Sequence, residues 1–486
     1  MTYDVIVVGA GPGGSSTAAF TARKGLSTLI LDRSDFPRDK VCGDGLTPQA
    51  LYWLDQLGCI DEVLTHTKSC IKTCDLFING KLLLTGGFPN TTQYPDFCVL
   101  LDRRRFDHIL LQHAVASGAE FQANSLVREI YQTPDHARVI LDHKGQRMEV
   151  QGKIVIGADG VSSVVSRSIG NVLKNGATAL SLRAYYQNVE AEGAQIKVYF
   201  DERFFPGYAW VFVDDDGFAN IGLGYAFDKP FPMIPNLKQV FQDFLDQDLG
   251  HLLRHASRCG AVSGGAVSFF KPKAIVADRV MLVGDAANQA DPLNGGGIHK
   301  AMEGAYLAAE TAHQAVLSGD CSVRVLQQYQ TQWEQQFELD WRTGELFLSV
   351  AKNPDLKEFC LFVLANIARM TTHDRQFQEF CSGVFSGVLS QNICLVPQAL
   401  FHAMPRNPAA WLAMLQLDEK GLVTGPLSLA VDAVTSSAKA SSRMLMSPWQ
   451  SLNWSLEVMT KVLRLARGHA EGSFTSTGPA SEKCPI

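Results

Sequence analysis

The chain has 486 residues, 46% of them hydrophobic and 19% charged, with a formal net charge of −6. This length allows two or three domains with large cores, and the acidic balance argues against nucleic acid as a partner. The eleven cysteines are scattered without paired metal-ligand spacing, which predicts reduced thiols and a cytoplasmic location. Because an apolar run begins within four residues of Met1, we expect no signal peptide.

The N-terminal stretch has the pattern of a dinucleotide-binding βαβ unit. An apolar run over 5–8 is followed by a glycine turn, a helix-like run and a second apolar run that ends in Asp32. Gly9 permits the tight turn, Gly11 lets the backbone approach a pyrophosphate, and Gly14 lets the helix pack on the strand. The helix N-terminus offers unpaired N–H groups to phosphates, and Asp32 is placed to accept hydrogen bonds from a ribose.

A loop rich in proline, glycine and charge follows over 36–45. It leaves the carboxyl edge of the predicted parallel sheet, where ligands bind in such folds, so Arg38 and Lys40 are candidates to contact phosphates or a carboxylate. Cys42 in this loop is either a buried structural cysteine or a residue of the site. A helix over 48–57 and a hairpin of strands at 74–78 and 81–85 come next; its turn is Asn79-Gly80, a type I′ signal.

A helix is predicted over 102–117, with Asp102 as its N-cap. Its first turn carries Arg103–Arg105, which on spacing alone favours a solvated face over a contact with phosphates. Strands are expected at 120–130, 137–141, 147–151 and 153–156. The last of them runs into an Asp159-Gly160 turn followed by a helix start.

The stretch over 176–271 alternates like an antiparallel sheet. Its strands are expected at 180–189, 195–201, 209–213 and 218–225, with an amphipathic helix over 236–256 behind them. Aromatic residues are dense here, among them Tyr208 and Trp210. Such residues either build a core or form an apolar wall for a substrate.

A third strand-and-glycine pattern follows over 280–297. An apolar run ends in Gly284-Asp285, and Gly295, Gly296 and Gly297 open a helix of about twenty residues. Residues 321–470 look mainly helical, and the charge-poor stretch 380–405 is interpreted as buried helices rather than a membrane span.

Near the C-terminus, Trp449 to Arg467 has an apolar stripe and three basic residues. The stripe favours either packing on the protein or lying on a membrane surface, and packing is the preferred interpretation. Residues 471–486 are predicted to be disordered.

Taken together, the three glycine patterns resemble those of FAD-dependent oxidoreductases of the para-hydroxybenzoate hydroxylase superfamily. Within it, the chain is most similar to the geranylgeranyl reductase family, over roughly residues 1–395 and through the stretches 37–43, 103–107, 206–212 and 294–298. The resemblance implies an α/β fold: a Rossmann-like FAD-binding domain with an inserted antiparallel substrate sheet and a helical C-terminal region. The expected boundaries are 1–75, 101–175 and 275–320 for the FAD-binding domain, 76–100 for the substrate-sheet hairpin, 176–274 for the substrate domain, 321–470 for the helical region and 471–486 for the tail.

The resemblance also implies non-covalent FAD. The cofactor-binding residues it implies are Gly9, Gly11, Gly14, Asp32, Arg33, Arg103, Asp159, Gly160, Gly284, Asp285, Gly295, Gly296 and Gly297. It makes Cys42 an active-site residue near the flavin, and Tyr208 and Trp210 walls of a tunnel for an isoprenoid. Asp44 and Val213 stand where the family commonly has other residues, and both departures concern the substrate side.

The function this implies is reduction of a C=C bond of a geranylgeranyl-type isoprenoid by hydride transfer from reduced flavin. NADPH or ferredoxin would act as transient external electron donor, because no second dinucleotide fold is evident. The alternatives are an aromatic monooxygenase or halogenase that works through a flavin hydroperoxide, and a flavin-binding scaffold or redox carrier without turnover. Since a long isoprenoid must be collected from a membrane, the 449–467 helix is the candidate for peripheral membrane contact if its stripe does not pack on the protein.

Overall fold

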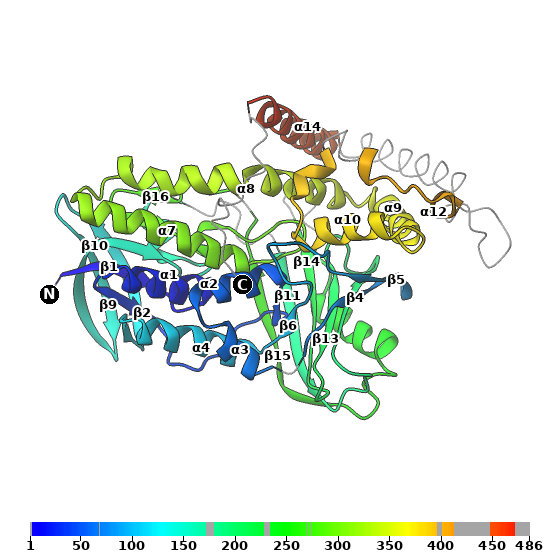
Figure 1. The fold of residues 1–486 in the computed structure, drawn as a ribbon, viewed down its shortest axis with the longest axis horizontal. Coiled ribbons are helices and arrows are strands. Elements are labelled where there is room, and N and C mark those ends of the chain that lie inside the picture. Colours follow the sequence, from blue (N-terminus) through cyan, green and yellow to red (C-terminus); the bar gives the residue numbers. More distant parts are fainter. Residues whose placement is uncertain are drawn as a thin grey trace.

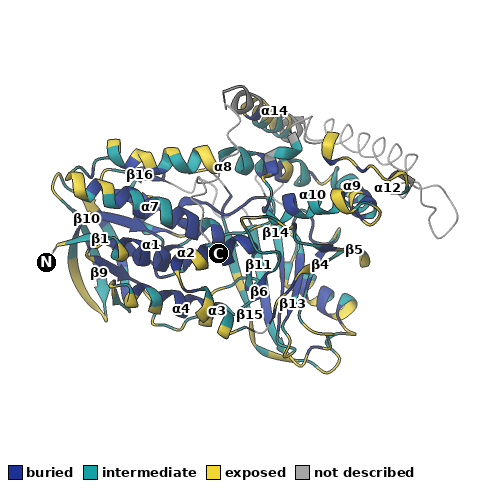
Figure 2. Cartoon of the chain, in the orientation of Figure 1, coloured by how far each residue is buried: buried dark blue, intermediate teal, exposed yellow. Residues whose placement is uncertain are grey.

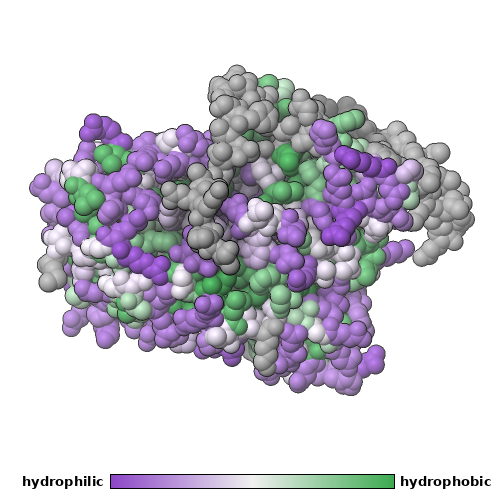
Figure 3. Space-filling view, viewed as in Figure 1, coloured by the Kyte–Doolittle hydropathy of each residue, from purple (hydrophilic) through white to green (hydrophobic). Residues whose placement is uncertain are grey.

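The computed structural model describes residues 2–67, 69–171, 179–227, 234–269, 271–272, 274–395, 401–412 and 448–471. These residues form two large sheets that lie side by side, with helices packed on both (Figure 1). The surface in Figure 3 is mainly hydrophilic, with apolar residues in small groups. The predicted α/β architecture with a second, largely antiparallel sheet and a helical C-terminal region is confirmed.

The first sheet has eight strands in the order β16-β17-β10-β1-β2-β7, with β8 and β9 continuing from β10. Its strands are β1 (Thr2–Val8), β2 (Thr28–Leu31), β7 (Glu120–Gln122), β8 (Ser125–Gln132), β9 (Ala137–His143), β10 (Gln146–Gly157), β16 (Val276–Ala277) and β17 (Val280–Leu282). β1 pairs in parallel with β2 and β10, and β10 pairs in parallel with β17. The carboxyl ends of β1, β10 and β17 therefore meet at one edge of the sheet.

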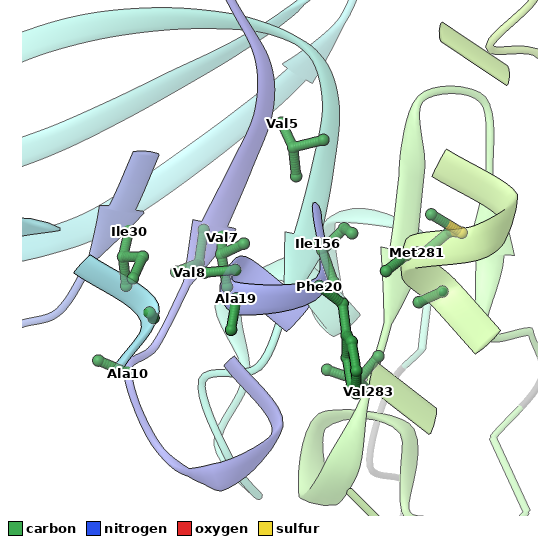
Figure 4. Close-up of a cluster of buried hydrophobic side chains, with 14 of the residues drawn as sticks. Val5, Val7, Val8, Ala10, Ala19, Phe20, Ile30, Ile156, Met281 and Val283 are labelled. Carbon is green, nitrogen blue, oxygen red and sulfur yellow. The ribbon is translucent and has the colours of Figure 1, made fainter. Parts of the chain in front are cut away.

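Helices cover this sheet because its central strands are apolar on both faces. α1 (Pro12–Arg23) packs against both α4 (Arg103–Ala116) and α7 (Ile298–Ser318). Figure 4 shows Val7, Ala19, Ile156 and Val283 converging in the resulting core, and buried residues are concentrated there in Figure 2. Burial of each valine or isoleucine among them contributes roughly 1.5–3 kcal/mol, and the packing holds the three strand ends in place.

Three strand predictions in this sheet are wrong in their boundaries. The strand predicted over 120–130 is divided into β7 and β8, because Asn124 between them has a left-handed backbone, with φ at 53°. The two strands predicted around Gly152 are instead the single strand β10. At Gly152 a Cβ would lie 2.8 Å from the Ile6 side chain, so this glycine permits a close approach and does not interrupt the strand.

The second sheet has seven strands in the order β15-β11-β14-β13-β12-β4-β5. Its strands are β4 (Thr73–Ile78), β5 (Lys81–Gly87), β11 (Ala179–Gln187), β12 (Gln195–Phe200), β13 (Ala209–Val213), β14 (Ala219–Ala226) and β15 (Ser257–Val267). The predicted hairpin is confirmed: β4 and β5 pair around Asn79 and Gly80, whose φ angles are 47° and 74°. β4 also pairs in parallel with β12, which attaches the hairpin to the rest of the sheet.

The helix predicted over 236–256 is shorter than expected. α6 (Leu237–Asp243) continues only as a π-helical turn over Phe244–Asp248, and the chain then turns at Leu249. β15, which follows, was not predicted. It is an edge strand with many glycine, serine and half-exposed positions, so it lacks the apolar alternation that marks a half-buried strand.

Shorter elements lie between the main strands and helices. They are β3 (Gly45–Leu46), β6 (Val99–Leu100), α2 (Pro48–Leu57), α3 (Ile60–Thr65), α5 (Val164–Ser168) and the 3-10 turn η2 (Gly284–Ala287). α2 matches the predicted helix, and Asp102 caps α4 as expected by accepting from the Arg105 N–H.

The C-terminal part is helical as predicted. It contains α8 (Val323–Ala351), α9 (Lys357–Thr371), α10 (Arg375–Ser386), the 3-10 turn η3 (Gln391–Leu395), α12 (Pro408–Leu412) and α14 (Pro448–Glu471). α8 packs on α7, and α9 and α10 pack on β5. Among the described helices, none is long and apolar enough to cross a membrane. The tail predicted to be disordered lies, from residue 472 onward, outside the described residues.

The interpretation that the apolar stripe of α14 packs on the protein is wrong for its described members. Leu456, Met459 and Leu463 are 45–53% exposed. Lys461, one of the three basic residues, is partly buried in ion pairs with Glu345 on α8 and with Glu457. The side chains of Trp449, Leu452, Ala466 and Arg467 lie outside the described residues.

Candidate functional site

The glycine turn after β1 combines two packed positions with one open position. A Cβ at Gly14 would lie 1.8 Å from the Gly9 carbonyl oxygen, and one at Gly9 would lie 2.4 Å from the Ala158 carbonyl oxygen. At Gly11 the nearest atom would be the Arg38 guanidinium, at 3.6 Å. Gly11 is the N-cap of α1, with no side-chain cap and no acidic residue in the first turn. The turn thus leaves a helix N-terminus accessible to an anion.

Asp32, at the end of β2, holds this turn in place. Its carboxylate accepts hydrogen bonds from the backbone N–H groups of Ala10 and Ser34, both at 2.8 Å. A carboxylate has about four lone-pair sites, so acceptor capacity remains for ribose hydroxyls. Arg33, the next residue, is exposed.

The second acid-glycine turn lies beside the first, because β10 pairs with β1 in register Val8 to Gly157. Asp159 accepts hydrogen bonds from the hydroxyl of Ser163, the N-cap of α5, and from the Val164 N–H at 2.7 Å. Burial raises the pKa of Asp159, and these hydrogen bonds oppose the shift. Its carboxylate therefore stabilises the start of α5. The neighbouring Gly160, with φ at 78°, would have no atom within 4 Å of a Cβ.

The third turn brings Asp285 into contact with the loop that carries Cys42. Lys40 donates to Asp285 at 2.9 Å, and this ion pair holds the pKa of Asp285 below its usual range. Gly297 is the N-cap of α7 and has no side-chain cap, so a second accessible helix N-terminus lies here. Gly284 packs on α7, where a Cβ would lie 3.2 Å from Ala301, and Gly295 has a φ of 72°.

Arg103 is buried, so the solvated-face interpretation is wrong for it, while Arg104 and Arg105 are exposed as that interpretation predicted. Its guanidinium makes two hydrogen bonds of 2.7 Å with Asp107, and it also interacts electrostatically with the Cys42 side chain. The surrounding chain covers Arg103 and Asp107. The spacing of the three arginines along the sequence does not indicate which of them is buried in this way.

Cys42, Tyr208 and Trp210 come together where the first sheet meets the second. At Gly43, next to Cys42, a Cβ would lie 2.9 Å from the Phe212 ring and 3.6 Å from the Trp210 indole nitrogen. The Tyr208 hydroxyl donates to the Asn294 carbonyl at 2.6 Å, beside Gly295 and Gly296, and burial raises the pKa of this tyrosine. The predicted wall residues thus join the second sheet to the turn before α7.

A polar group behind Cys42 was missed as part of the site. Asn220 receives the Trp210 indole N–H at 2.8 Å and donates to the Cys42 carbonyl and to Asp44, both at 2.7 Å. Tyr185 also donates to Asp44, at 2.6 Å. In the sequence, Asp44 stands out only because it departs from the family pattern. No regular spacing along the chain indicates that it contacts Tyr185 on β11 and Asn220 on β14.

These residues fit a flavin dinucleotide. The open position at Gly11 and the uncapped N-terminus of α1 would hold the pyrophosphate, and Asp32 would hold the ribose. The uncapped N-terminus of α7 would favour negative charge on the pyrimidine side of the flavin ring. Cys42 and Trp210 would then lie toward the second sheet, on the substrate side.

Comparison with known proteins gives the same assignment. Residues 2–228 match the family model described as an FAD binding domain. Digeranylgeranylglycerophospholipid reductase 2 of Methanococcoides burtonii is 31% identical over 349 residues, which cover 68% of this chain and 80% of that protein. Digeranylgeranylglycerophospholipid reductase 1 of Methanopyrus kandleri is 31% identical over 376 residues, which cover 75% and 94%.

Solved structures agree. A geranylgeranyl bacteriochlorophyll reductase-like protein from Thermoplasma acidophilum has a TM-score of 0.65 at 26% identity, with 76% of this chain and 91% of that one covered. A flavin-dependent brominase, with a TM-score of 0.62 at 20% identity over 75% and 94% of the two chains, shares the fold. The fold and the site therefore define an FAD-dependent oxidoreductase. Within that class, the chain belongs to the geranylgeranyl reductase family.

Proposed function

We propose that this protein reduces C=C bonds in an isoprenoid chain of the geranylgeranyl type. The observation that carries the proposal is the meeting of Cys42, Tyr208 and Trp210 between the glycine turns and an apolar region of the second sheet. The names of the relatives, reductases of digeranylgeranylglycerophospholipids, support the same substrate class.

An apolar cluster continues from Tyr208 and Phe212 away from the glycine turns. It is built from β4, β12 and α9 and includes Ile78, Val198, Phe200, Phe205 and Leu361. These five side chains are only 2–8% exposed, so the cluster is a packed apolar core; its partly buried margin at Tyr208 and Phe212 would offer apolar contacts to a hydrocarbon chain and keep water from the reacting carbons.

With reduced FAD held at the glycine turns, the chemistry available at this site would be addition of a hydride to one carbon of the double bond. A proton from a protein acid or water adds to the other carbon, so the alkene gains two hydrogens and loses none. Trp210 and Tyr208 hold the alkene, and the hydrogen bond from Tyr208 to the Asn294 carbonyl keeps this wall against the turn before α7. Cys42 lies on the same side, where its thiol contacts Arg103. NADPH or ferredoxin would reduce the flavin in a transient encounter.

Product mass tests this proposal. Purified holoprotein, reduced without oxygen, would be incubated with a geranylgeranylated glycerophospholipid, and the products would be weighed by mass spectrometry. Gain of two hydrogens per double bond is expected. Gain of one oxygen, or replacement of hydrogen by a halogen when oxygen and halide are supplied with aromatic substrates, would establish the monooxygenase or halogenase instead. No product from any of these substrates would contradict an enzymatic role.

We also propose that α14 binds the surface of an anionic lipid membrane, from which such a substrate would be collected. Its apolar face consists of Leu456, Met459, Val462 and Leu463, each 45–53% exposed. Because Lys461 is already paired with Glu345 and Glu457, apolar burial would supply most of the affinity, and salt would weaken binding little.

Liposome co-sedimentation tests the α14 proposal. Serine at Leu456, Met459 and Leu463 together should reduce recovery with anionic vesicles. Serine at Leu317, a 73% exposed leucine at the end of α7, is the matched control and should leave recovery unchanged. Equal recovery of both variants would exclude α14 as the contact.

A further inference from the structure

A buried carboxyl group lies directly behind the Cys42-Gly43 pair. Asp44 is only 3% exposed, and its backbone is left-handed, with φ at 66°. The Asp44 carbonyl accepts from the Leu101 N–H at 3.1 Å, and the next two residues form β3, which pairs with β6. The position of this carboxyl is therefore determined by the backbone on both sides.

One oxygen of Asp44 connects the carboxyl to the proposed substrate wall. Oδ2 accepts from Tyr185 at 2.6 Å and from the amide nitrogen of Asn220 at 2.7 Å. The orientation of the Asn220 amide follows from its other partners, because the Trp210 indole can only donate and the Cys42 carbonyl can only accept. A continuous set of hydrogen bonds thus runs from Asp44 through Asn220 to both residues of the site.

The other oxygen is buried and unpaired. Among the described residues, neither Asp44 Oδ1 nor Arg183 Nε has a hydrogen-bond partner. Arg183 lies on β11, stacks 3.8 Å from the Tyr185 ring centre and pairs with Asp39 at 2.7 Å. Oδ1 is thus available to carry a proton.

The charged and titratable groups that act on Asp44 come from several elements. Arg183 and Tyr185 face it from β11, Arg103 acts on it from α4, and Cys42 lies on its own loop. Burial raises the pKa of Asp44 to about 7, although these two arginines and the hydrogen bonds from Tyr185 and Asn220 favour the carboxylate. Burial thus favours the neutral form of this carboxyl, while its hydrogen bonds and the two arginines favour the charged form.

We propose that Asp44 is a positioning residue whose protonation state sets how firmly Asn220 holds the Cys42 backbone and the Trp210 indole. Hydrogen bonds to a carboxylate are roughly twice as strong as those to a neutral group, so uptake of a proton weakens the bonds to Tyr185 and Asn220. The inference rests on the proposed function, since it gives Cys42 and Trp210 their place at the substrate.

Three variants of the FAD-bound protein test the proposal. Asp44→Asn removes the ionisation and keeps the size of the side chain. Tyr185→Phe removes one donor to the carboxylate and keeps the ring that stacks on Phe218. Tyr186→Phe is the matched control, because this neighbouring residue on β11 packs in the core on the other face of the sheet.

The first measurement needs no turnover. Nuclear magnetic resonance follows isotope-labelled aspartate carboxyls and the Trp210 indole N–H as pH changes, with Asp44 assigned by its absence in Asp44→Asn. In the wild type both signals should titrate together near pH 7. Tyr185→Phe should move this titration to higher pH, because loss of the donor destabilises the carboxylate. Tyr186→Phe should leave it unchanged, and in Asp44→Asn the indole titration should vanish.

The second measurement is turnover. Below the same inflection the KM for the isoprenoid should rise about fivefold, with a smaller change in kcat, and Asp44→Asn should show the raised KM at every pH. The proposal would be overturned if the indole titration persists in Asp44→Asn or if the titration is unshifted in Tyr185→Phe. If Asp44→Asn fails to fold, the result for Tyr185→Phe decides between the outcomes. If the wild type reduces no isoprenoid, the proposed function fails, while the resonance titrations still decide the role of Asp44.

Discussion

Asp107→Asn should strongly destabilise the fold, because Asp107 neutralises a buried guanidinium. Asp107 is fully buried and accepts two hydrogen bonds of 2.7 Å from Arg103 and one of 3.0 Å from Arg38. The amide keeps the shape but removes the negative charge, and one acceptor becomes a donor. Removing one partner of a buried ion pair costs about 3–5 kcal/mol, since the other charge stays buried and uncompensated. We expect a loss of this size in the free energy of unfolding.

Urea unfolding followed by circular dichroism measures this loss, with flavin release as a second signal. Asp142→Asn is the matched control, because Asp142 pairs with Arg128 at 2.7 Å where both side chains are substantially exposed. Exposed pairs contribute only about 0–1 kcal/mol. If Asp107→Asn costs no more than the control, the buried charge of Arg103 does not depend on Asp107, and the reasoning is refuted.

Three further substitutions test the site. Cys42→Ser should lower turnover while flavin absorbance shows unchanged FAD content; lost stability with normal specific activity in the surviving fraction would instead mark a structural cysteine. Gly14→Ala should lower the free energy of unfolding by about 1–3 kcal/mol through overpacking. Gly13→Ala is the control and should be tolerated, because its Cβ would lie 3.4 Å from its nearest neighbours, an ordinary contact distance. Equal urea midpoints for the two variants would contradict this prediction. Lys40→Met should raise the pKa of Asp285. In the wild type, the lowered pKa of Asp285 stabilises the fold at pH values above the pKa of this group in the unfolded chain, and this stability is lost as the pH falls. Acid unfolding of the variant should therefore begin at higher pH. An unchanged acid profile would count against the ion pair.

Local pattern was sufficient for most elements near the site. The apolar run of β1 followed by spaced glycines, the Asn79-Gly80 turn and the Asp102 cap each depend on a few adjacent residues whose backbone preferences are strong. Where local pattern failed, a neighbour distant in the chain decided the outcome. Gly152 continues β10 because Ile6 packs against it, and β15 is a strand because β11 offers it an edge to pair with.

The three strand-and-glycine turns are each evident as local patterns in the chain, and parallel pairing of β1, β10 and β17 brings them to one sheet edge. Which charges are buried at that edge, and what they contact, depends on how distant segments pack. Lys40 reaches Asp285 across 245 positions, and Asn220 reaches Asp44 across 176. Spacing along the chain carries no signal for such pairs, since sheet order and loop packing choose the partner. The same packing makes Arg103 a buried neighbour of Cys42 while the two arginines after it remain in solvent.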